Sequence, residues 1–446
     1  MKYFNKITSI IFAIILLLFV VVFTAYYRGW FGPHFILIKT NFTQLPGWEK
    51  DDHKLALETL QKSCLRIAKQ DPNKPFSRSL SQSGTFGDWQ KICLAIDQVD
   101  KNDSARARKF FEYWFKPYRI YNNFKTKGLF TGYYLPTLNC SLIQDQQYNV
   151  PIYAIPDDWV KVDLGVFDKK LEGRTLIGQL KKDHLLGRYP TRAAITKGAI
   201  AKKAKVLAWC DDKIDVAFAH VQGSAIVQLS SNTEYQNSVP IHPSNLGVQL
   251  GGKEKTTEVY FPVVSDATSN AENQNMVCMP PEQKHFLIGY EGANGRSYTS
   301  IGKVLIKSGE LTAQNSSMQD IRAWMMQHPE KADGILNQNA SYVFFRILKN
   351  EDPLGSQQVP LTPERSLAVD KKYIPLGAPI WLDTSVPENT SQIATPFQHL
   401  LIAQDTGGAI KGIIRGDVYW GSGDRATFNA GHMKSQGSYW ILLPRI

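Results

Sequence analysis

The stretch QDTGGAIKGIIRGDVYWG, residues 404–421, decides the fold of this chain. It places Asp405 before a glycine-rich turn and Asp417 directly after Gly416, and a third aspartate, Asp370, stands in LAVDKKYIPLG, residues 367–377. Each aspartate lies next to turn residues where a short apolar strand is expected to end. Loops at the ends of strands are where a rigid β framework displays catalytic groups. The three aspartates are therefore candidate catalytic residues.

Asp417 has the sequence surroundings of a carboxyl group with a raised pKa. It stands between Ile413-Ile414 and Tyr419-Trp420, with Asp405 near in sequence. Apolar walls and a neighbouring carboxylate both raise the pKa of an aspartate. A carboxylic acid that keeps its proton near neutral pH can give it to a glycosidic oxygen. The alternative is that these aspartates cap turns or pair with Lys411 and Arg415, and the local pattern leaves both interpretations open.

Two other functions for the glycine-rich segment were weighed. A phosphate-binding loop requires a hydroxyl residue after its lysine, whereas Lys411 precedes Gly412, so nucleotide binding is excluded. Asp405-Thr406-Gly407 is similar to the active-site turn of an aspartic protease. Such a protease needs two aspartates. Because the chain carries one such turn, this interpretation survives only for a homodimer.

Several side chains could contact a sugar. Flat aromatic side chains pack against the C–H faces of sugar rings, although core packing explains each of them as well. The polar side chains of Gln222 and Ser224, on either side of Gly223, could form hydrogen bonds with sugar hydroxyls. Turn chemistry explains these residue types nearly as well. The candidates are Tyr133, Tyr134, Gln222, Ser224, Tyr298 and Trp420.

Outside residues 404–421 the sequence pattern predicts mainly β-strands, with helices before and after them. Helical spacing of apolar residues predicts helices over 51–68, 105–115, 300–308 and 317–336, with Ser316 and Gln319 as a capping box for the last. Short apolar runs cut by turn residues predict strands over 128–138, 150–155, 216–229, 378–382, 399–403 and 439–443. Residues 230–281 are polar and predict a long surface insertion. One domain therefore interrupts another.

The N-terminus predicts a membrane anchor. No charge occurs from Ile7 to Tyr27, which matches the roughly 20 apolar residues that cross a bilayer. Lys2 and Lys6 precede the run, so the positive-inside rule places the N-terminus in the cytoplasm and the rest of the chain outside it. A cleaved signal peptide is the alternative.

Composition places the remainder among ordinary globular proteins. With 446 residues, 43% hydrophobic and 20% charged, the chain is expected to form two or three domains. A net charge of +11 suits an anionic partner or is simply a solvated basic surface. Five cysteines and nine histidines have no zinc-site spacing, so we predict no metal and no cofactor. Cys64 and Cys93 either form a disulfide or are two small buried side chains.

The tail blocks closely resemble the three-aspartate domain of the membrane-bound lytic murein transglycosylase A family. The likeness covers nearly the whole region after the anchor. Its upstream blocks are LPGW (45–48), GLFTGYY (128–134), YPTR (189–192), VQGS (221–224), SYTSIG (297–302) and NQNASYVFF (337–345).

The resemblance implies a mainly β fold, in which a double-psi β-barrel domain with flanking helices is interrupted by a second, smaller β domain. The expected division is an anchor and short linker over 1–38, the barrel over 39–131 and 290–446, and the inserted domain over 132–289, with the insertion at about 230–281. The glycan would lie in a groove. Asp417 matches the catalytic aspartate of the family, and Asp405 and Asp370 match the two that shape its surroundings. The residues that would bind substrate are Tyr133, Tyr134, Gln222, Ser224, Tyr298, Lys411 and Trp420.

The activity that this resemblance implies is cleavage of peptidoglycan glycan strands between N-acetylmuramic acid and N-acetylglucosamine, with a 1,6-anhydro product. No nucleic-acid partner is expected. Two alternatives stay open: a non-catalytic glycan-binding module, and a glycoside hydrolase in which Asp405 is the second carboxylate. The chain departs from outer-membrane lipoproteins of the family because no lipobox cysteine follows the apolar run. We therefore expect an inner-membrane anchor with the rest of the chain in the periplasm.

Overall fold

The computed structural model describes residues 12, 14–24, 34–99, 103–182, 184–230, 238–240, 260–262, 284–349, 352–387 and 394–446. The chain folds into two compact units. Unit 1 comprises residues 1–133, 354–421 and 428–446, and unit 2 comprises residues 134–353 and 422–427. Residues 284–353 therefore belong with unit 2, whereas the sequence analysis assigned 290–353 to the barrel domain.

Unit 1 is built around one mixed sheet of eight strands. Its helices are α2 (His53–Ile67), α3 (Phe86–Ile96) and α4 (Ser104–Trp114), and α10 (Asp424–His432) begins in unit 2 and ends in unit 1. Its strands are β1 (Phe35–Lys39), β2 (Phe115–Asn122), β3 (Gly128–Tyr133), β15 (Ser366–Val369), β16 (Pro379–Pro387), β17 (Ala394–Asp405), β18 (Arg415–Tyr419) and β19 (Lys434–Pro444).

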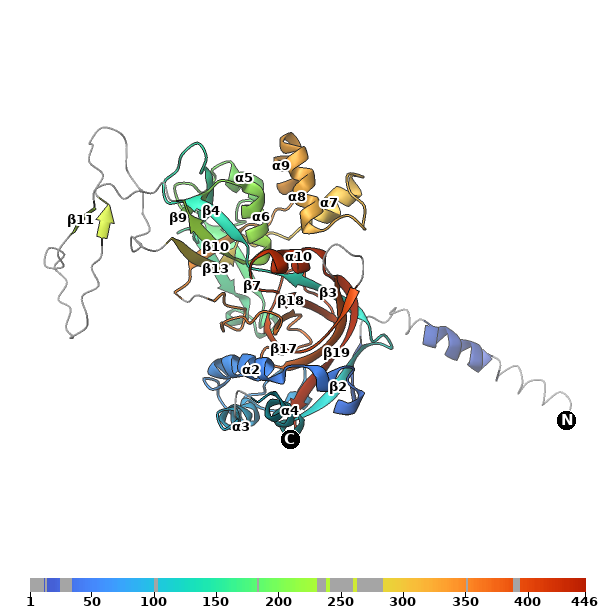
Figure 1. The fold of residues 1–446 in the computed structure, drawn as a ribbon. Coiled ribbons are helices and arrows are strands. Elements are labelled where there is room, and N and C mark those ends of the chain that lie inside the picture. The colour runs from blue at the N-terminus through green and yellow to red at the C-terminus, as the bar shows by residue number, and fades with distance from the viewer. Residues whose placement is uncertain are drawn as a thin grey trace, which may run out of the picture. The chain divides into compact units, whose positions relative to one another are not determined.

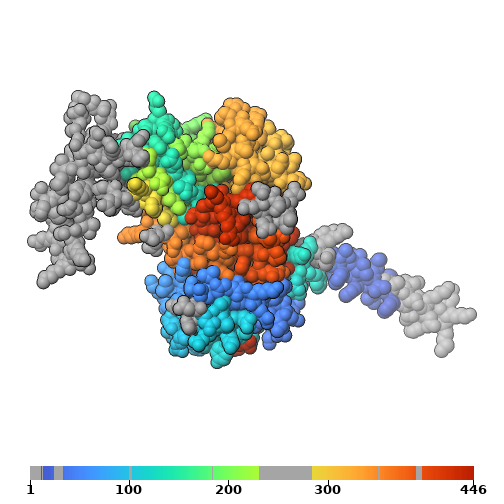
Figure 2. Space-filling model, viewed as in Figure 1, coloured from blue at the N-terminus to red at the C-terminus, as the bar shows by residue number. Residues whose placement is uncertain are grey.

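Six of the eight hydrogen-bonded strands of unit 1 form a closed circuit, from which β2 and β1 extend. The order runs β1-β2-β19-β16-β17-β15-β18-β3, and β3 pairs again with β19. The pairs β15–β17 and β18–β3 are parallel and the others are antiparallel. The circuit brings together segments from the two ends of the chain, which Figure 2 shows as adjoining blue and red residues. The fold is thus mainly β, as predicted.

Helices α2, α3 and α4 lie on one side of the sheet of unit 1 (Figure 1). Helices α2, α3 and α4 pack together, and α2 also contacts β17 (Figure 1). A disulfide joins Cys64 on α2 to Cys93 on α3, which confirms the disulfide as the better of the two sequence interpretations. The helices predicted over 51–68 and 105–115 are confirmed as α2 and α4. Helix α3 was missed, although Thr85 and Asp88 form a capping box at its start.

Unit 2 contains a second mixed sheet with the order β14-β13-β10-β4-β9-β5 and a separate three-stranded sheet, β6-β7-β8. Its helices are α5 (Arg192–Thr196), α6 (Lys213–Gln222), α7 (Ile301–Lys307), α8 (Met318–Gln327) and α9 (Pro329–Leu336). Its strands are β4 (Thr137–Ser141), β5 (Val150–Tyr153), β6 (Trp159–Asp163), β7 (Thr175–Leu180), β8 (Leu186–Gly187), β9 (Val206–Cys210), β10 (Ser224–Leu229), β11 (Ser238–Pro240), β12 (Tyr260–Pro262), β13 (His285–Ala293) and β14 (Val343–Ile347).

Two local predictions in unit 2 were wrong. The strand expected over 216–229 is the helix α6 followed by β10, because Asp212 caps the helix and Gly223, with φ +81°, ends it in the left-handed conformation. The capping box before α8 is formed by Ser317 and Asp320, one residue beyond the predicted pair. A disulfide that the sequence did not predict joins Cys140 and Cys210, which lie opposite each other on β4 and β9.

Two predictions concern residues that the structure describes only in part. Of the span predicted over 7–27 the structure describes residues 12 and 14–24, which are helical, and no helix among the described residues is long and apolar enough to cross a membrane. The insertion predicted over 230–281 lies outside the described residues, apart from Ser230 and the two short strands β11 and β12.

Candidate active site

Strand pairing in unit 1 places two of the three aspartates, Asp405 and Asp417, next to Ala368. Ala368 on β15 pairs with Asp417 on β18 and with Asp405 at the end of β17. On its other side β18 runs parallel to β3, which places Thr131 opposite Asp417. Paired residues point to the same face of a sheet, so Asp417, Asp405 and Thr131 share a face. The local geometry of the site therefore follows from the register of four strands.

The Asp417 carboxyl group is largely surrounded by protein but accepts a single hydrogen bond. The Thr131 hydroxyl donates to Asp417 Oδ1, and Oδ2 has no donor among the described residues. Burial raises the pKa of Asp417 to about 6, against the charge of Arg415 and the Thr131 hydrogen bond, which lower it, while the charge of Asp405 raises it further. The side chain remains partly exposed. Asp417 is thus a carboxyl group that can hold a proton near neutral pH and that solvent reaches.

Arg415 fixes the direction of that hydrogen bond. Its Nη2 donates to Thr131 Oγ1 over 2.8 Å, and Nη1 donates to the carbonyl oxygens of Leu129 and Gly416. Because Thr131 Oγ1 accepts from Arg415, its own proton is directed to Asp417. Burial lowers the pKa of the Arg415 guanidinium, and the nearby Asp417 charge opposes that shift. The alternative that Asp417 pairs directly with Arg415 is therefore replaced by a contact through the Thr131 hydroxyl.

Asp405 is fully engaged by the protein. Its Oδ1 accepts hydrogen bonds of 2.8 Å from Ser356 N, Ser356 Oγ and Thr406 N, and its Oδ2 accepts one of 3.0 Å from the Tyr133 hydroxyl. Burial raises the pKa of Asp405, although these hydrogen bonds lower it. Burial also raises the pKa of Tyr133, helped by the charge of Asp405, so the phenol stays a donor. When Asp405 is ionised, its charge raises the pKa of Asp417.

Asp370 holds the glycine-rich loop. Its Oδ2 accepts a 2.9 Å hydrogen bond from Gly412 N, and its Oδ1 accepts one of 3.2 Å from Lys372 N. Gly412 has φ +120°, a conformation that only glycine adopts readily. This aspartate caps turns, as the structural alternative predicted. Its role is to place the segment that leads from Asp405 to Asp417.

The other predicted contacts in unit 1 differ in exposure. Tyr133 is 8% exposed and Trp420 is 6% exposed, and the Trp420 ring packs on Phe397. A side chain at Gly132 would collide with the Trp420 indole, because an added Cβ would lie 2.5 Å from its Nε1. Little of either ring reaches the surface. Lys411, by contrast, is exposed in the loop between the two aspartates.

Four predicted contacts lie in unit 2 rather than with the aspartates. Gln222 Oε1 accepts a 3.0 Å hydrogen bond from Tyr134 N, so these two residues are brought together. Ser224 is buried at the start of β10, and Tyr298 is 40% exposed before α7. The polar groups of Gln222 are used within the unit, since Nε2 contacts Met318 Sδ at 3.5 Å.

The sequence analysis missed three residues of the site. Thr131 lies in the motif GLFTGYY, but nothing in one sequence indicates that β3 lies beside β18. Ser356 has no sequence signal. Arg415 was considered only as an ion-pair partner, and its bond to Thr131 depends on the tertiary structure. Among the described residues no group of His, Cys, Asp and Glu is arranged to hold a metal ion.

The fold and this site define a mainly β protein with one partly exposed carboxyl group that titrates near neutral pH beside a second, fully engaged carboxylate. Residues 129–238 and 277–346 match the MltA specific insert domain, and residues 365–443 match the 3D domain. The chain belongs to the membrane-bound lytic murein transglycosylase A family.

Known relatives match over most of the chain. A membrane-bound lytic murein transglycosylase A homolog of Buchnera aphidicola is 28% identical over 82% of this chain and 77% of its own length. Three further curated relatives are 28% identical, and the chain spans 65% of their length.

Two solved structures are similar along almost their whole length. The lytic transglycosylase LtgG of Burkholderia pseudomallei is 32% identical, with a TM-score of 0.52, over 93% of this chain and 98% of that one. The membrane-bound lytic murein transglycosylase of Agrobacterium tumefaciens is 27% identical, with a TM-score of 0.70, over 92% and 98%.

The insert-domain match ends at residue 346, close to the end of the main segment of unit 2 at Pro353. The match also passes over residues 239–276, which fall within the predicted insertion. This chain thus carries a longer connection there than the family pattern describes.

Proposed function

We propose that this chain is a peptidoglycan lytic transglycosylase, in which Asp417 is the single catalytic acid and base. The observation that carries the proposal is a carboxyl group with a pKa of about 6 and one oxygen that has no donor among the described residues. A general acid works best when its pKa lies near the working pH. Membership of the family supports peptidoglycan glycan strands as the substrate.

The geometry supports a two-step use of Asp417. In the first step Oδ2 gives its proton to the oxygen between C1 of N-acetylmuramic acid and C4 of N-acetylglucosamine, and the C1–O bond breaks. In the second step the carboxylate removes the proton of the C6 hydroxyl of the same muramoyl residue while O6 bonds to C1. The product carries a 1,6-anhydro ring, no water is consumed, and Asp417 ends protonated.

The hydrogen bonds of Asp405 limit its use in ordinary hydrolysis. A glycosidase needs a second carboxylate that attacks the sugar or activates water. Asp405 Oδ1 accepts three hydrogen bonds, so only Oδ2, which accepts one from the Tyr133 hydroxyl, retains a lone pair for that task. In the proposed reaction Asp405 keeps the pKa of Asp417 raised through its charge, and Asp370 positions the loop between them.

The substrate contacts that we propose are the residues matched to family motifs. They are Tyr133, Tyr134, Gln222, Ser224, Tyr298, Lys411 and Trp420. Tyr133, Tyr134, Ser224 and Trp420 are buried, so Tyr133 and Trp420 would act by supporting the sheet around Asp417, while Lys411 and Tyr298 are exposed enough to touch glycan.

We further propose that the strand circuit of unit 1 is a double-psi β-barrel. The return of β3 to β19 and the two parallel pairs support this assignment. The segment 1–38 would anchor the chain in the inner membrane and place both units in the periplasm. Its uncharged run and the absence of a cysteine at its end support that location.

Mass spectrometry of purified peptidoglycan digested by the full-length chain in detergent tests the function. We expect anhydromuropeptides from the parent and none from Asp417→Asn, with Asp333→Asn, exposed on α9, as the matched control. Products heavier by one water, with reducing ends, would mean hydrolysis. Glycan binding without any cleavage would establish a non-catalytic module instead.

A further inference from the structure

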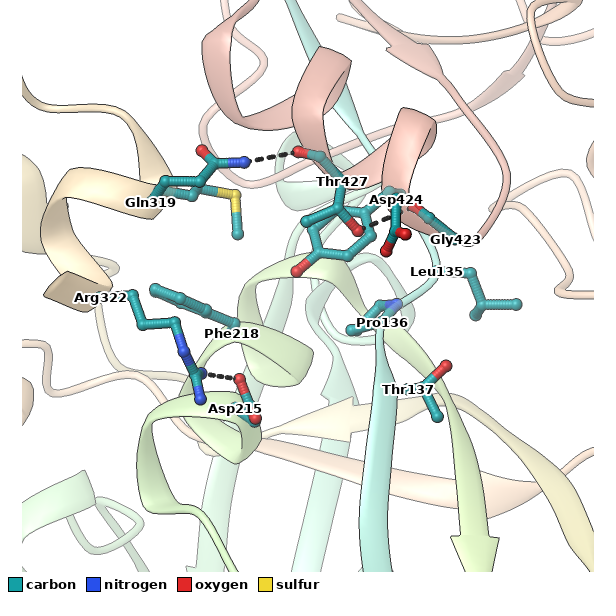
Figure 3. A pocket seen from close by; sticks show the side chains of 12 residues that line it. Leu135, Pro136, Thr137, Asp215, Phe218, Gln319, Arg322, Gly423, Asp424 and Thr427 are labelled. Carbon is teal, nitrogen blue, oxygen red and sulfur yellow. Dashed lines mark hydrogen bonds and ion pairs between the residues drawn. The ribbon is translucent and has the colours of Figure 1, made fainter. Parts of the chain in front are cut away.

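Unit 2 contains a pocket of about 280 Å³ whose lining residues take no part in the proposed proton transfers, although Tyr134 is also one of the proposed substrate contacts. All of its lining residues belong to unit 2, from the segment before β4, from α6 and α8, and from residues 423–427. Figure 3 shows Arg322 and Phe218 on one side of it and Asp424 on the other. Its chemistry can therefore be read independently of Asp417.

Most hydrogen-bond donors around this pocket are already engaged. Gln319 Nε2 donates to the carbonyl oxygen of Thr427 over 2.9 Å, and Thr427 Oγ1 donates to that of Gly423 over 3.0 Å. Arg322 donates to Asp215 through Nη1 and to Asp212 through Nη2. Figure 3 shows the bonds from Gln319 and Arg322 as dashed lines. The pocket therefore offers few free hydrogen-bond donors to a ligand that carries acceptors.

The acceptors of the pocket are in excess. Asp215 uses one carboxylate oxygen for Arg322, and burial raises the pKa of Asp215 because its charge is poorly solvated. A buried acceptor of this kind costs free energy unless a donor reaches it. Asp424, at the start of α10, adds an exposed carboxylate with no ion pair among the described residues. Gln319 Oε1 has no hydrogen-bond partner among the described residues, but it is shielded from solvent.

Tyr134 adds an independent indication that the pocket receives a polar group. Its side chain is only 8% exposed, it lines the pocket, and its hydroxyl has no hydrogen bond among the described residues. Burial raises the pKa of Tyr134 to about 12, helped by the charge of Asp215. A buried phenol normally has a partner. Here the missing partner would come from the pocket.

Charge and shape narrow the class of ligand. The pocket is lined by two carboxylates, Asp215 and Asp424, and by one guanidinium, that of Arg322, which also pairs with Asp212, so the charges lining the pocket are negative in sum in a chain with a net charge of +11. An ammonium group offers three donors and no acceptor. The apolar walls of Phe218 and Met318 suit the methylene chain that carries such a group.

We propose that this pocket binds a primary ammonium group of the peptidoglycan substrate. The proposal rests on the proposed function, because it gives that enzyme a preference among glycan strands. Two parts of peptidoglycan supply the group: the diamino acid of the stem peptide, and glucosamine that has lost its acetyl group. Both share the chemistry that the pocket selects.

The test compares substrates with free and acetylated amines, using the full-length chain in detergent. We expect the parent to show a KM about tenfold lower for strands with free stem-peptide amines than for acetylated strands, the factor that one charge-assisted hydrogen bond provides. Asp215→Asn and Asp424→Asn should each reduce that ratio toward one without lowering kcat. Asp333→Asn, outside the pocket, should retain it.

Peptide-free strands, with and without de-N-acetylated glucosamine, identify the source of the amine. Preference for the de-N-acetylated strands would assign the pocket to the sugar amine, and preference only when stems are present would assign it to the peptide. Equal KM values for free and acetylated substrates, with anhydro products still formed, would overturn this inference alone. The binding affinities of Asp417→Asn for the free and acetylated strands measure the amine preference without turnover. Absence of cleavage by the parent would therefore reject the proposed function and leave the amine preference testable.

Discussion

Two aspartates of unit 1 differ in pKa because of what surrounds them. Asp51 accepts four hydrogen bonds: 2.8 Å bonds from Nη1 and Nη2 of Arg365, one of 2.6 Å from His399 Nδ1 and one of 2.8 Å from Leu400 N. Asp417 accepts one, from Thr131. Burial raises the pKa of both carboxyl groups, but for Asp51 the hydrogen bonds and the charge of Arg365 outweigh burial and hold its pKa far below the usual range.

The difference shows that burial alone does not set the charge of a carboxyl group. A bidentate guanidinium with a backbone N–H replaces the water that Asp51 loses, so the carboxylate is stabilised and joins the N-terminal segment to β17. Burial removes much of the water around Asp417, and few protein hydrogen bonds replace it, because Arg415 contacts Asp417 only through the Thr131 hydroxyl. The first arrangement stabilises the fold, and the second keeps a proton available.

The largest effect is expected from breaking the Asp51 pair. Asp51→Asn should lower the free energy of unfolding by about 3–5 kcal/mol at pH 7, since it leaves the guanidinium of Arg365 buried without its counter-charge. Urea unfolding of the full chain measures this, with the exposed Glu49→Gln as control. The pKa of Asp51 is lowered on folding, so its contribution is present above the unfolded pKa of about 4 and lost as pH falls below it. A loss under 1 kcal/mol would contradict the comparison.

The opposite sign is expected at Asp417. Its pKa is raised to about 6 in the folded state, so at pH 8 the carboxylate is charged before and after unfolding and the folded state bears the cost of burying it. Asp417→Asn should therefore stabilise the chain at pH 8 by at most about 3 kcal/mol. The gain should disappear near pH 4, where the carboxyl group is protonated in the folded state. Thermal unfolding at both pH values measures it, and destabilisation at pH 8 would show that Asp417 is a structural carboxylate like Asp51.

Removing the Thr131 hydroxyl tests the single hydrogen bond. Thr131→Val should lower the rate of anhydro-product formation about tenfold to a hundredfold, since a hydrogen bond to a charged group contributes roughly 1.5–3 kcal/mol. Thr131→Ser keeps the hydroxyl and should keep most of the rate. The rates come from timed digests of peptidoglycan. If valine and serine behaved alike, the hydroxyl would have no part in positioning Asp417.

The smallest effect is expected from Arg415. Its charge lowers the pKa of Asp417, so Arg415→Met should raise that pKa and move the alkaline limb of the pH–rate profile to higher pH. Activity near pH 8 should rise a few-fold relative to the optimum. Arg415→Lys, which retains the charge, should leave the limb near that of the parent. A limb that moves to lower pH would mean that Arg415 acts on another group.

Local pattern was sufficient for much of the molecule. The helices α2 and α4 and the three aspartates with their surrounding turns follow from the spacing of apolar residues and glycines over a few positions. The secondary-structure predictions were wrong where the same apolar residues are compatible with both a strand and a helix. The apolar run before Gly223 suits a strand or a helix, and only the cap by Asp212 and the packing of α6 in unit 2 decide for the helix.

The sequence by itself determined the mainly β class, the family likeness and the identity of the candidate acid. The tertiary structure decided which groups surround that acid. Thr131 and Asp417 are 286 residues apart, and the register of β3 against β18 brings them into contact. The same holds for Asp51 and Arg365, 314 residues apart. A pKa depends on solvent and on charges within a few ångströms, and one-dimensional order does not specify those neighbours.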